Sequence, residues 1–368
     1  MAPLTARVVA TLAASVAVGV GVALAKAERD RRCERERRAR QRDFVLLPDE
    51  PVAAGLRRIA LGQLDLTIEL LGGAGGAGPD ENAVHETRKA LKRLRALLRL
   101  LEVELGAQVF TRESAMLRDA GRRLAGARDA EVMVATLEGL IERHPQKLGP
   151  RPGVARLRER LAAERARAEQ RALGDTATRA EVLSELRALR AEVSAWQLSD
   201  RSGIALLEPG LGHVYRQGRR RYGRAARGKG DRGRALHEWR KRVKDLRYAA
   251  EILDSRERDE RDGGRRRRHK RARRPHSARI HELATRADRL GEVLGEEHDL
   301  AMLAERVGSR SGGARGERVG RRTRKILLEL IAKRRRKLRR RSLREGARLY
   351  RRPPRRFVSK VRRAHRRA

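Results

Sequence analysis

The chain carries one basic motif twice, at an offset of 152 residues. In the pattern His-x-x-Arg-Lys-x-x-Lys, the first copy occupies His85–Lys92 and the second occupies His237–Lys244. Ammonium and guanidinium groups donate charge-assisted hydrogen bonds to phosphate oxygens, and each such contact with a polyanion releases condensed counterions. Cations spaced about one helical turn apart can meet successive phosphates of a polymer. The motifs therefore indicate a binding surface for a phosphate polymer, with an affinity that falls steeply as salt rises.

Helical geometry places these cations on one face of each segment. At about 100° per residue, the basic positions fall within roughly one third of the helix circumference. The two basic stripes comprise His85, Arg88, Lys89, Lys92, Arg95 and Arg99 in the first copy and His237, Arg240, Lys241, Lys244 and Arg247 in the second. Opposite them lie Leu91, Leu94 and Leu97, and Trp239, Val243 and Leu246, respectively. Both segments are therefore predicted to be amphipathic helices whose apolar faces pack in a core.

The alternative interpretation of either stripe is an ordinary solvated helix face. Like charges four residues apart cost about 0.2–0.5 kcal/mol per pair, and Arg88 and Lys92 accept that cost with no acid between them. The chain has 12 Lys against 79 Arg, yet four of the 12 are Lys89, Lys92, Lys241 and Lys244, at matching positions. Because Lys and Arg are not interchangeable at phosphate sites, these lysines favour a specific role.

The motif histidines admit two roles. While neutral, His85 and His237 can donate a hydrogen bond from one ring nitrogen, and below about pH 6.5 they would gain charge. Alternatively, they hold the helix ends by capping. Asp129 and Asp299, close to the stripes in the repeat, are expected to pair with Arg or to cap a helix rather than to bind a metal.

No complete enzyme motif is present. Gly223–Gly230 comes nearest to a phosphate-binding loop, but Gly230 stands where the Mg-binding Ser or Thr is required, and no strand precedes it. The His-Glu pairs at His85, His237 and His281 lack a second His four residues later, so no zinc-protease motif results. We therefore predict no catalytic residue, no metal ligand and no cofactor.

Helical periodicity extends over most of the chain beyond Phe44. Apolar residues recur at helical spacing, and strand signals are nearly absent. Breaks are predicted at Gly72–Pro79, Pro145–Gly153, Asp200–Gly212 and Gly228–Gly233. A second repeated pair, Leu124–Asp129 and Leu294–Asp299, follows the two basic motifs. The chain is therefore predicted to be all-α, with two halves of one architecture.

The composition predicts a polyanionic partner. Lys and Arg number 91 against 48 Asp and Glu, a formal charge of +43 that strongly repels itself unless a polyanion accompanies it. A general Arg-rich composition, with solvated Arg on every helix face, is the alternative. Aromatic residues make up only 2%, so stacking platforms for single-stranded nucleic acid are scarce. Cys33 is the only cysteine, which excludes an intrachain disulfide and fits a reducing compartment.

The N-terminal segment is predicted to contact the membrane. Residues 8–25 form an uncharged run just long enough to span a bilayer, and Lys26 and an Arg-dense stretch come after it. We predict an anchor at residues 1–26 and a basic linker at 27–43, and the positive-inside rule places the chain beyond Lys26 in the cytoplasm. The alternative is a cleaved signal peptide over residues 1–25, ending in Ala23-Leu24-Ala25, which would export the protein.

Two further segments are predicted to lack regular structure. Residues 255–277 hold Gly263-Gly264 and a dense run of Arg, which is typical of a disordered insert between helices. Residues 352–368 lie beyond Leu349 and contain Pro353-Pro354 and many Arg. They are predicted to be an unfolded basic tail.

These repeated motifs resemble those of the conserved histidine α-helical domain family. The similar segments are His85–Arg95, Leu124–Asp129, His237–Tyr248 and Leu294–Asp299, within residues 44–351. The resemblance implies an all-α fold of two four-helix bundles related by pseudo-twofold symmetry, with halves of about 44–200 and 201–351. It implies inorganic polyphosphate as the ligand, held in a basic central channel by the residues of both stripes. Further candidates are Arg128, His298 and Tyr248.

Two positions depart from the family pattern. Ala125 replaces the usual glycine, which affects one helix turn. Arg242 stands where the first copy has Ala90, on the side of the helix that faces the core.

We therefore predict non-catalytic binding of inorganic polyphosphate, by a protein held at the cytoplasmic face of the membrane or at polyphosphate granules. The alternative function is non-specific nucleic-acid binding, or association with the nucleoid, through the Arg-rich insert and the tail. A third hypothesis, a scaffold for a polyphosphate enzyme, has no motif of its own. No feature of the sequence predicts the oligomeric state.

Overall fold

The computed structural model describes residues 44–47, 50–73, 81–124, 126–199, 203–228, 230–254, 277–308 and 319–365. Within these ranges every regular element is a helix and no strand occurs, so the all-α prediction is confirmed. The predicted anchor at residues 8–25, the basic linker and residues 255–276 of the insert lie outside the described ranges. None of the described helices has the apolar length needed to cross a bilayer.

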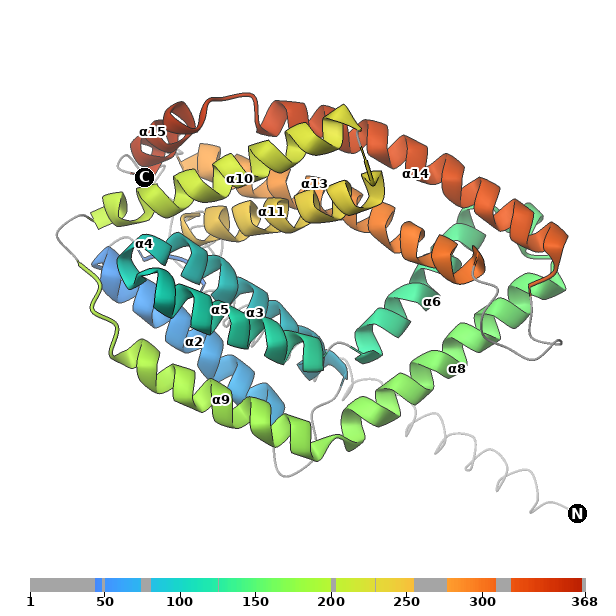
Figure 1. The fold of residues 1–368 in the computed structure, drawn as a ribbon, viewed down its shortest axis with the longest axis horizontal. Coiled ribbons are helices and arrows are strands. Elements are labelled where there is room, and N and C mark those ends of the chain that lie inside the picture. Colours follow the sequence, from blue (N-terminus) through green and yellow to red (C-terminus); the bar gives the residue numbers. More distant parts are fainter. Residues whose placement is uncertain are drawn as a thin grey trace, which may run out of the picture. The chain divides into compact units, whose positions relative to one another are not determined.

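In the described part of the chain, the first half forms eight helices (Figure 1). They are α2 (Val52–Gly72), α3 (Glu81–Leu100), α4 (Glu102–Leu105), α5 (Ala107–Arg123), α6 (Gly126–Arg143), α7 (Pro145–Leu148), α8 (Pro152–Gly174) and α9 (Thr176–Ser194). Proline at the first turn starts α7 and α8, and Asp175 caps α9 by accepting a hydrogen bond from the Thr178 N–H at 3.0 Å.

The described residues of the second half form a short 3-10 helix and five α-helices. They are η2 (Gly203–Leu207), α10 (Glu208–Arg227), α11 (Arg232–Ile252), α13 (Ser277–Gly308), α14 (Arg321–Leu349) and α15 (Pro354–His365). Gly228 ends α10 in the left-handed region, at φ 65°, and Asp231 caps α11 through the Arg234 N–H. A break therefore separates α10 from α11 as predicted, but it is two residues shorter than Gly228–Gly233, because α11 already begins at Arg232.

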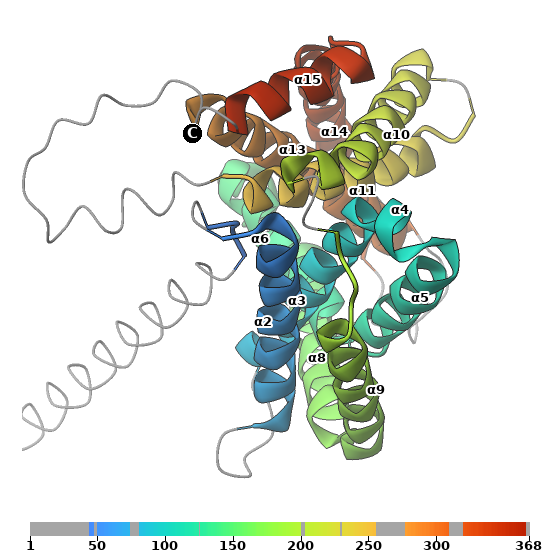
Figure 2. The ribbon, with the colours of Figure 1, turned by 90° about the vertical axis from the view of Figure 1, so that its left-hand side faces the viewer.

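The same helix pairings occur in both halves. In the first half α2 packs on α3 and α9, α3 on α5, and α6 on α8; in the second half α10 packs on α11 and α15, α11 on α13, and α13 on α14. Contacts of α3 with α11 and of α6 with α13 join the halves. Both views show α2, α3, α5 and α9 grouped together, apart from α10, α11, α13 and α15 (Figures 1 and 2).

One hydrophobic core crosses the boundary between the halves. It is built from α6, α7, α8, α13 and α14. Its buried side chains are Leu137, Leu140, Leu148, Val154, Leu157, Leu161, Val293, Leu300, Leu303, Val307, Leu327, Leu330, Ile331 and Leu338. Residues from both sides of position 200 thus share one core, and the division into two four-helix bundles stays a prediction.

The second repeated pair has a different backbone in each half. Leu294–Asp299 lies inside the unbroken helix α13, whereas α5 ends at Arg123 and α6 begins at Gly126. In the second copy Gly295 lies against a motif side chain, because a Cβ there would come within 3.2 Å of Arg240 Nη2. Ala125, which departs from the family pattern, lies outside the described residues.

The predicted break at Asp200–Gly212 is too long, because α10 already begins at Glu208. Gly210 lies inside this helix, where a Cβ would collide with the Leu100 carbonyl oxygen. The glycine thus permits α10 to cross closely over the end of α3, and it does not interrupt the helix.

The unfolded-tail prediction is wrong for residues 354–365, which form α15. Phe357, Val361 and Ala364 recur at helical spacing between the arginines and are buried. Phe357 stacks on Tyr215 of α10, with ring centroids 3.8 Å apart and planes 9° from parallel. The surrounding charge hides this apolar stripe in the sequence, and its burial explains why the segment folds.

Candidate functional site

The two motif helices bury the faces that the sequence assigns to the core. Leu91, Leu94 and Leu97 of α3 are at most 2% exposed, and Trp239 and Val243 of α11 are fully buried. Since α3 and α11 also contact each other, the two basic stripes are brought to one region of the molecule. The amphipathic division of both helices is therefore confirmed.

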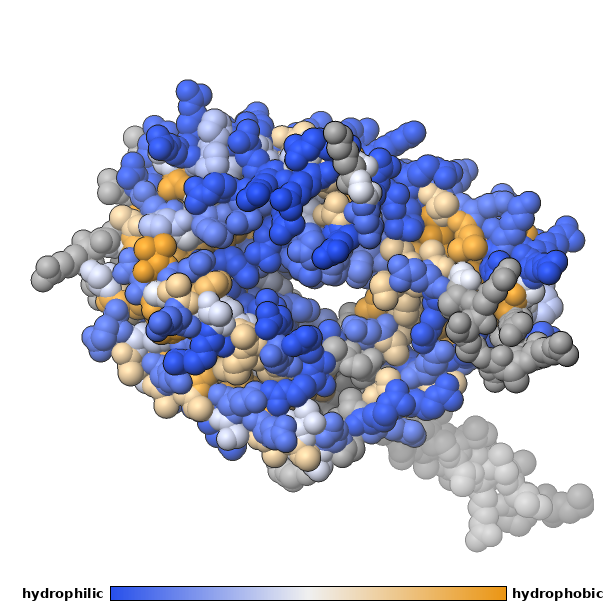
Figure 3. Space-filling view, in the orientation of Figure 1, coloured by the Kyte–Doolittle hydropathy of each residue, from blue (hydrophilic) through white to orange (hydrophobic). Residues whose placement is uncertain are grey.

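Most of the predicted site residues line one cavity of about 1110 Å³, called the main cavity below. From the basic stripes these are His85, Arg88, Lys92, Arg95, His237, Arg240, Lys241 and Lys244, joined by the further candidates His298 and Tyr248. Figure 3 shows a central hollow bordered largely by hydrophilic residues. Side chains from positions 152 residues apart thus face a common space.

Additional cations reach the main cavity from helices that do not carry the repeated basic motif. They are Arg118 and Arg122 of α5, Arg167 and Arg171 of α8, and Arg306 of α13. With these and Arg242, twelve of the described Lys and Arg side chains line the main cavity against five described carboxylates, so it carries an excess of positive charge. These arginines belong to no repeated motif. Their position at the cavity wall follows only from the packing of α5, α8 and α13.

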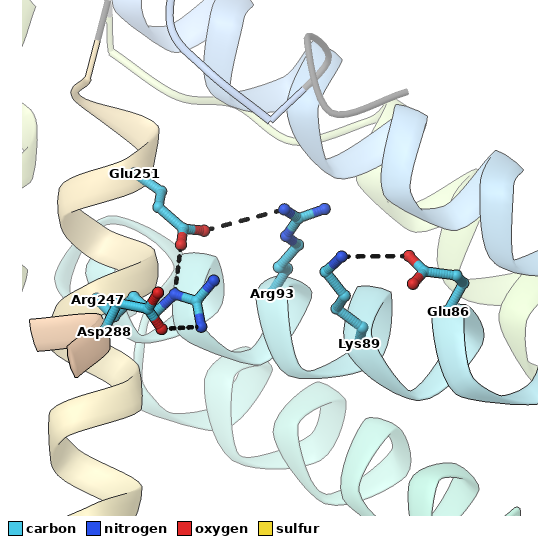
Figure 4. A network of polar contacts seen from close by, with 6 residues as sticks. All are labelled: Glu86, Lys89, Arg93, Arg247, Glu251 and Asp288. Atoms are coloured by element: carbon cyan, nitrogen blue, oxygen red, sulfur yellow. Dashed lines mark hydrogen bonds and ion pairs between the residues drawn. The ribbon is translucent and has the colours of Figure 1, made fainter. Parts of the chain in front are cut away.

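Three residues of the basic stripes lie outside the main cavity, and Figure 4 shows the ion pairs of two of them, Lys89 and Arg247. Lys89 forms an ion pair with Glu86 of its own helix at 3.3 Å. Arg247 pairs with Glu251 at 2.5 Å and with Asp288 of α13 at 2.5 Å. Nearby carboxylates thus neutralise both side chains. The side chain of a further candidate, Arg128, lies outside the described residues.

Arg99, the last residue of the first stripe, is buried at the contact between α3 and α11. It is 9% exposed and pairs with Asp245 of α11 at 2.8 Å. Arg242 pairs with the same carboxylate at 3.0 Å and lines the main cavity. The expectation that Arg242 faces the core is therefore wrong, because Asp245 holds its guanidinium at the cavity wall.

A reciprocal pair of ion bridges connects the two motif helices. Arg99 pairs with Asp245. Arg93 lies 3.9 Å from Glu251, and Figure 4 shows this second pair. At the repeat offset of 152 residues, Arg93 corresponds to Asp245 and Arg99 to Glu251. The residue at the first of these two positions in each copy thus contacts the residue at the second position in the other copy. A contact across a twofold axis has this pattern.

A smaller cavity of about 530 Å³ adjoins the main one and contains Arg247. The two cavities share Arg240, Lys244 and Asp299 in their linings. Carboxylates in the smaller cavity also include Glu131, Asp288, Glu292 and Glu296. Cations no longer predominate there, so of these two cavities the main one carries the larger excess of positive charge.

Lys244 lies at the wall of the main cavity, close to several other cations. Burial, followed by Arg240, Lys92 and Arg247, lowers the pKa of Lys244 to about 7, and Asp299 opposes that shift. The ammonium form of this side chain is therefore costly among these cations. A bound anion would favour it, because an opposite charge nearby stabilises the protonated amine.

The histidine pair at the cavity wall is held neutral. His237 and His298 lie with ring centroids 4.3 Å apart. Burial, followed by His298 and Lys241, lowers the pKa of His237 to about 4, and burial and Arg240 lower that of His298. Near neutral pH each ring can donate one N–H. The expected gain of charge by His237 just below pH 6.5 is wrong, because burial first, and neighbouring cations second, disfavour its protonated form.

Comparison with known proteins agrees with this geometry. A family model described as the CHAD domain matches residues 67–308, which is more than half of the chain. The match begins within α2 and ends with α13, so it includes both motif helices and excludes α14 and α15. No curated protein sequence matches the chain.

Proposed function

This chain belongs to the CHAD-domain family, and on that premise we propose that its main cavity binds inorganic polyphosphate without transforming it. The observation that carries the proposal is the convergence of both motif helices on one space in which cations outnumber carboxylates. Guanidinium and ammonium groups there can contact successive phosphates. Because the walls hold few aromatic side chains, the cavity favours a ligand that is all phosphate over one that carries bases.

We also propose that the two halves are pseudo-twofold-related copies that arose by duplication. Three observations support this: the recurring helix pairings, the reciprocal bridges Arg93–Glu251 and Arg99–Asp245, and the approach of Gly153 to Thr323. The last two residues are equivalent at the 170-residue offset of the second repeated pair, and equivalent residues meet at a twofold axis. Such symmetry would let a polymer contact two equivalent stripes.

Binding of long-chain polyphosphate should be much tighter than binding of double-stranded DNA of equal charge. The cavity can surround a thin, flexible polymer with cations, whereas a duplex about 20 Å across is too wide to enter. A competition assay of polyphosphate, DNA and RNA across a salt series measures this difference. Equal affinities at near-physiological salt would contradict the proposal.

A deletion variant separates polymer binding in the cavity from binding by the insert. Removal of residues 256–276 should leave the polyphosphate affinity within about threefold of that of the full chain. A large loss of affinity would instead mean that the insert binds the polymer. Truncation after Tyr350 is unsuitable for this purpose, because it removes the buried side chains of α15.

We propose further that residues 8–25 anchor the protein in a membrane, with the cavity on the cytoplasmic side or at polyphosphate granules. The uncharged run and the basic flank after it support this. Membrane fractionation of the full chain and of a variant that starts at residue 27 tests the proposal. Recovery of both proteins in the soluble fraction would argue against an anchor.

A further inference from the structure

The outer face of α14 carries a third basic stripe, called the outer stripe. It comprises Lys333, Arg336, Lys337, Arg340, Arg344 and Arg348, all exposed. On a helix these positions lie within about 120° of arc and extend over about 22 Å. Glu329 and Glu345 are the only acidic residues of α14, and Glu345 is paired with Arg341 at 2.7 Å. The helix thus presents a straight row of cations to solvent.

Carboxylates of α13 form ion pairs with three other arginines of α14 but not with the outer stripe. Arg334 pairs with Glu296 at 2.7 Å, and Arg335 and Arg339 reach Glu297 at 3.0 and 2.8 Å. No cation of the outer stripe forms an ion pair with another residue that the structure describes. Its charge is therefore available to a partner.

A general excess of arginine does not explain the outer stripe. Helix α8 corresponds to α14 in the repeat, since Leu157 and Leu327 are equivalent at the 170-residue offset and both are buried. At the same offset, Lys333, Arg340 and Arg344 correspond to Ala163, Gln170 and Gly174. Of these two equivalent helices, α14 carries a continuous row of cations at these positions and α8 does not.

We propose that the outer stripe binds the phosphate backbone of double-stranded nucleic acid. Its cations are mainly arginines, which pair with phosphate oxygens, and a straight helix can follow the phosphates that border a groove about 12 Å wide. The large exposed apolar residues of the described chain are Val103 and Met302, neither of them on α14. The outer stripe therefore has no ring on which to stack single-stranded bases and no apolar side chain to insert into a membrane.

This inference goes beyond the proposed function, because the outer stripe and the main cavity have no residue in common. It also lies outside the residues that match the family. A protein with both surfaces would hold polyphosphate in its interior while its exterior contacts a duplex. The two ligands would then bind the same molecule at once.

The test uses the full chain carrying Arg336→Gln, Lys337→Gln, Arg340→Gln and Arg344→Gln. Its affinity for a 20-base-pair DNA duplex, measured by fluorescence anisotropy at near-physiological salt, should fall at least about tenfold. The slope of log affinity against log salt should decrease in magnitude by about 4, roughly one for each cation removed. Affinity for polyphosphate should stay within about threefold.

A matched control removes the same charge from other helices, with Arg156→Gln, Arg187→Gln, Arg216→Gln and Arg289→Gln, all at exposed positions outside the main cavity. This control should keep its DNA affinity within about threefold. Circular dichroism and the melting temperature verify that both variants fold.

Three results would overturn the assignment. The first is an equal loss of DNA affinity in the stripe variant and the control variant. The second is an unchanged DNA affinity in the stripe variant. The third is a stripe variant that no longer binds anionic phospholipid vesicles but still binds DNA. Retained duplex binding in a protein that does not bind polyphosphate would leave the inference standing and refute the proposed function alone.

Discussion

Replacing Lys92 and Lys244 with glutamate should weaken polyphosphate binding at least about 100-fold. One lysine comes from each motif helix and both line the main cavity, so the double variant removes a cation from both stripes. Each charge-assisted hydrogen bond contributes about 1.5–3 kcal/mol, and the new carboxylates would also repel phosphate. Isothermal titration calorimetry at fixed salt measures the loss.

Lys147→Glu with Lys325→Glu is the control for total charge. Both lysines are exposed and lie outside the main cavity, so this variant changes the net charge equally. Its polyphosphate affinity should stay within about threefold. Comparable losses in the two double variants would mean that overall charge holds the polymer and the cavity does not.

Polyphosphate affinity should fall as pH rises above 7. Burial and neighbouring cations hold the pKa of Lys244 at about 7. A bound phosphate would raise this pKa, because its negative charge stabilises the protonated amine. Above pH 7 the free protein carries a largely neutral Lys244, so binding takes up a proton. Affinity therefore declines by up to about tenfold per pH unit until the pKa of the complex is reached, and it is unaffected below pH 7.

Lys244→Arg isolates this effect, because guanidinium stays protonated throughout the range. The variant should bind polyphosphate with little pH dependence between pH 7 and 9, while the parent loses affinity. Titration calorimetry in buffers of different ionisation enthalpy counts the protons taken up on binding. Long polyphosphate chains are used so that protonation of their terminal phosphates contributes little to this count. A parent whose affinity is constant from pH 6.5 to 9 would refute the role of Lys244.

Local periodicity was enough to predict which face of each motif helix is buried. Leu91 and Trp239 occupy the core because helix geometry alone determines that they lie opposite the cations. Eight of the eleven stripe residues line the main cavity, and their role as phosphate ligands stays a prediction. These predictions succeeded because they depend on neighbours within one helix.

Predictions that depended on distant neighbours fared less well. The burial of Arg99 and the position of Arg242 both follow from Asp245, a carboxylate whose partners are known only once α3 and α11 are packed together. The contributions of Arg118 and Arg306 likewise require the placement of whole helices. Local sequence predicts a break at Gly210, because the close approach of this glycine to the end of α3 depends on residues far away in the chain.

The reciprocal bridges between α3 and α11 also determine which half can pair with which. The two contacting positions are basic in the first copy, where they are Arg93 and Arg99. They are acidic in the second copy, where they are Asp245 and Glu251. Two first halves brought together in this way would oppose arginine to arginine, and two second halves would oppose carboxylate to carboxylate. Like charges thus disfavour both self-pairings, and the contact selects the mixed pair.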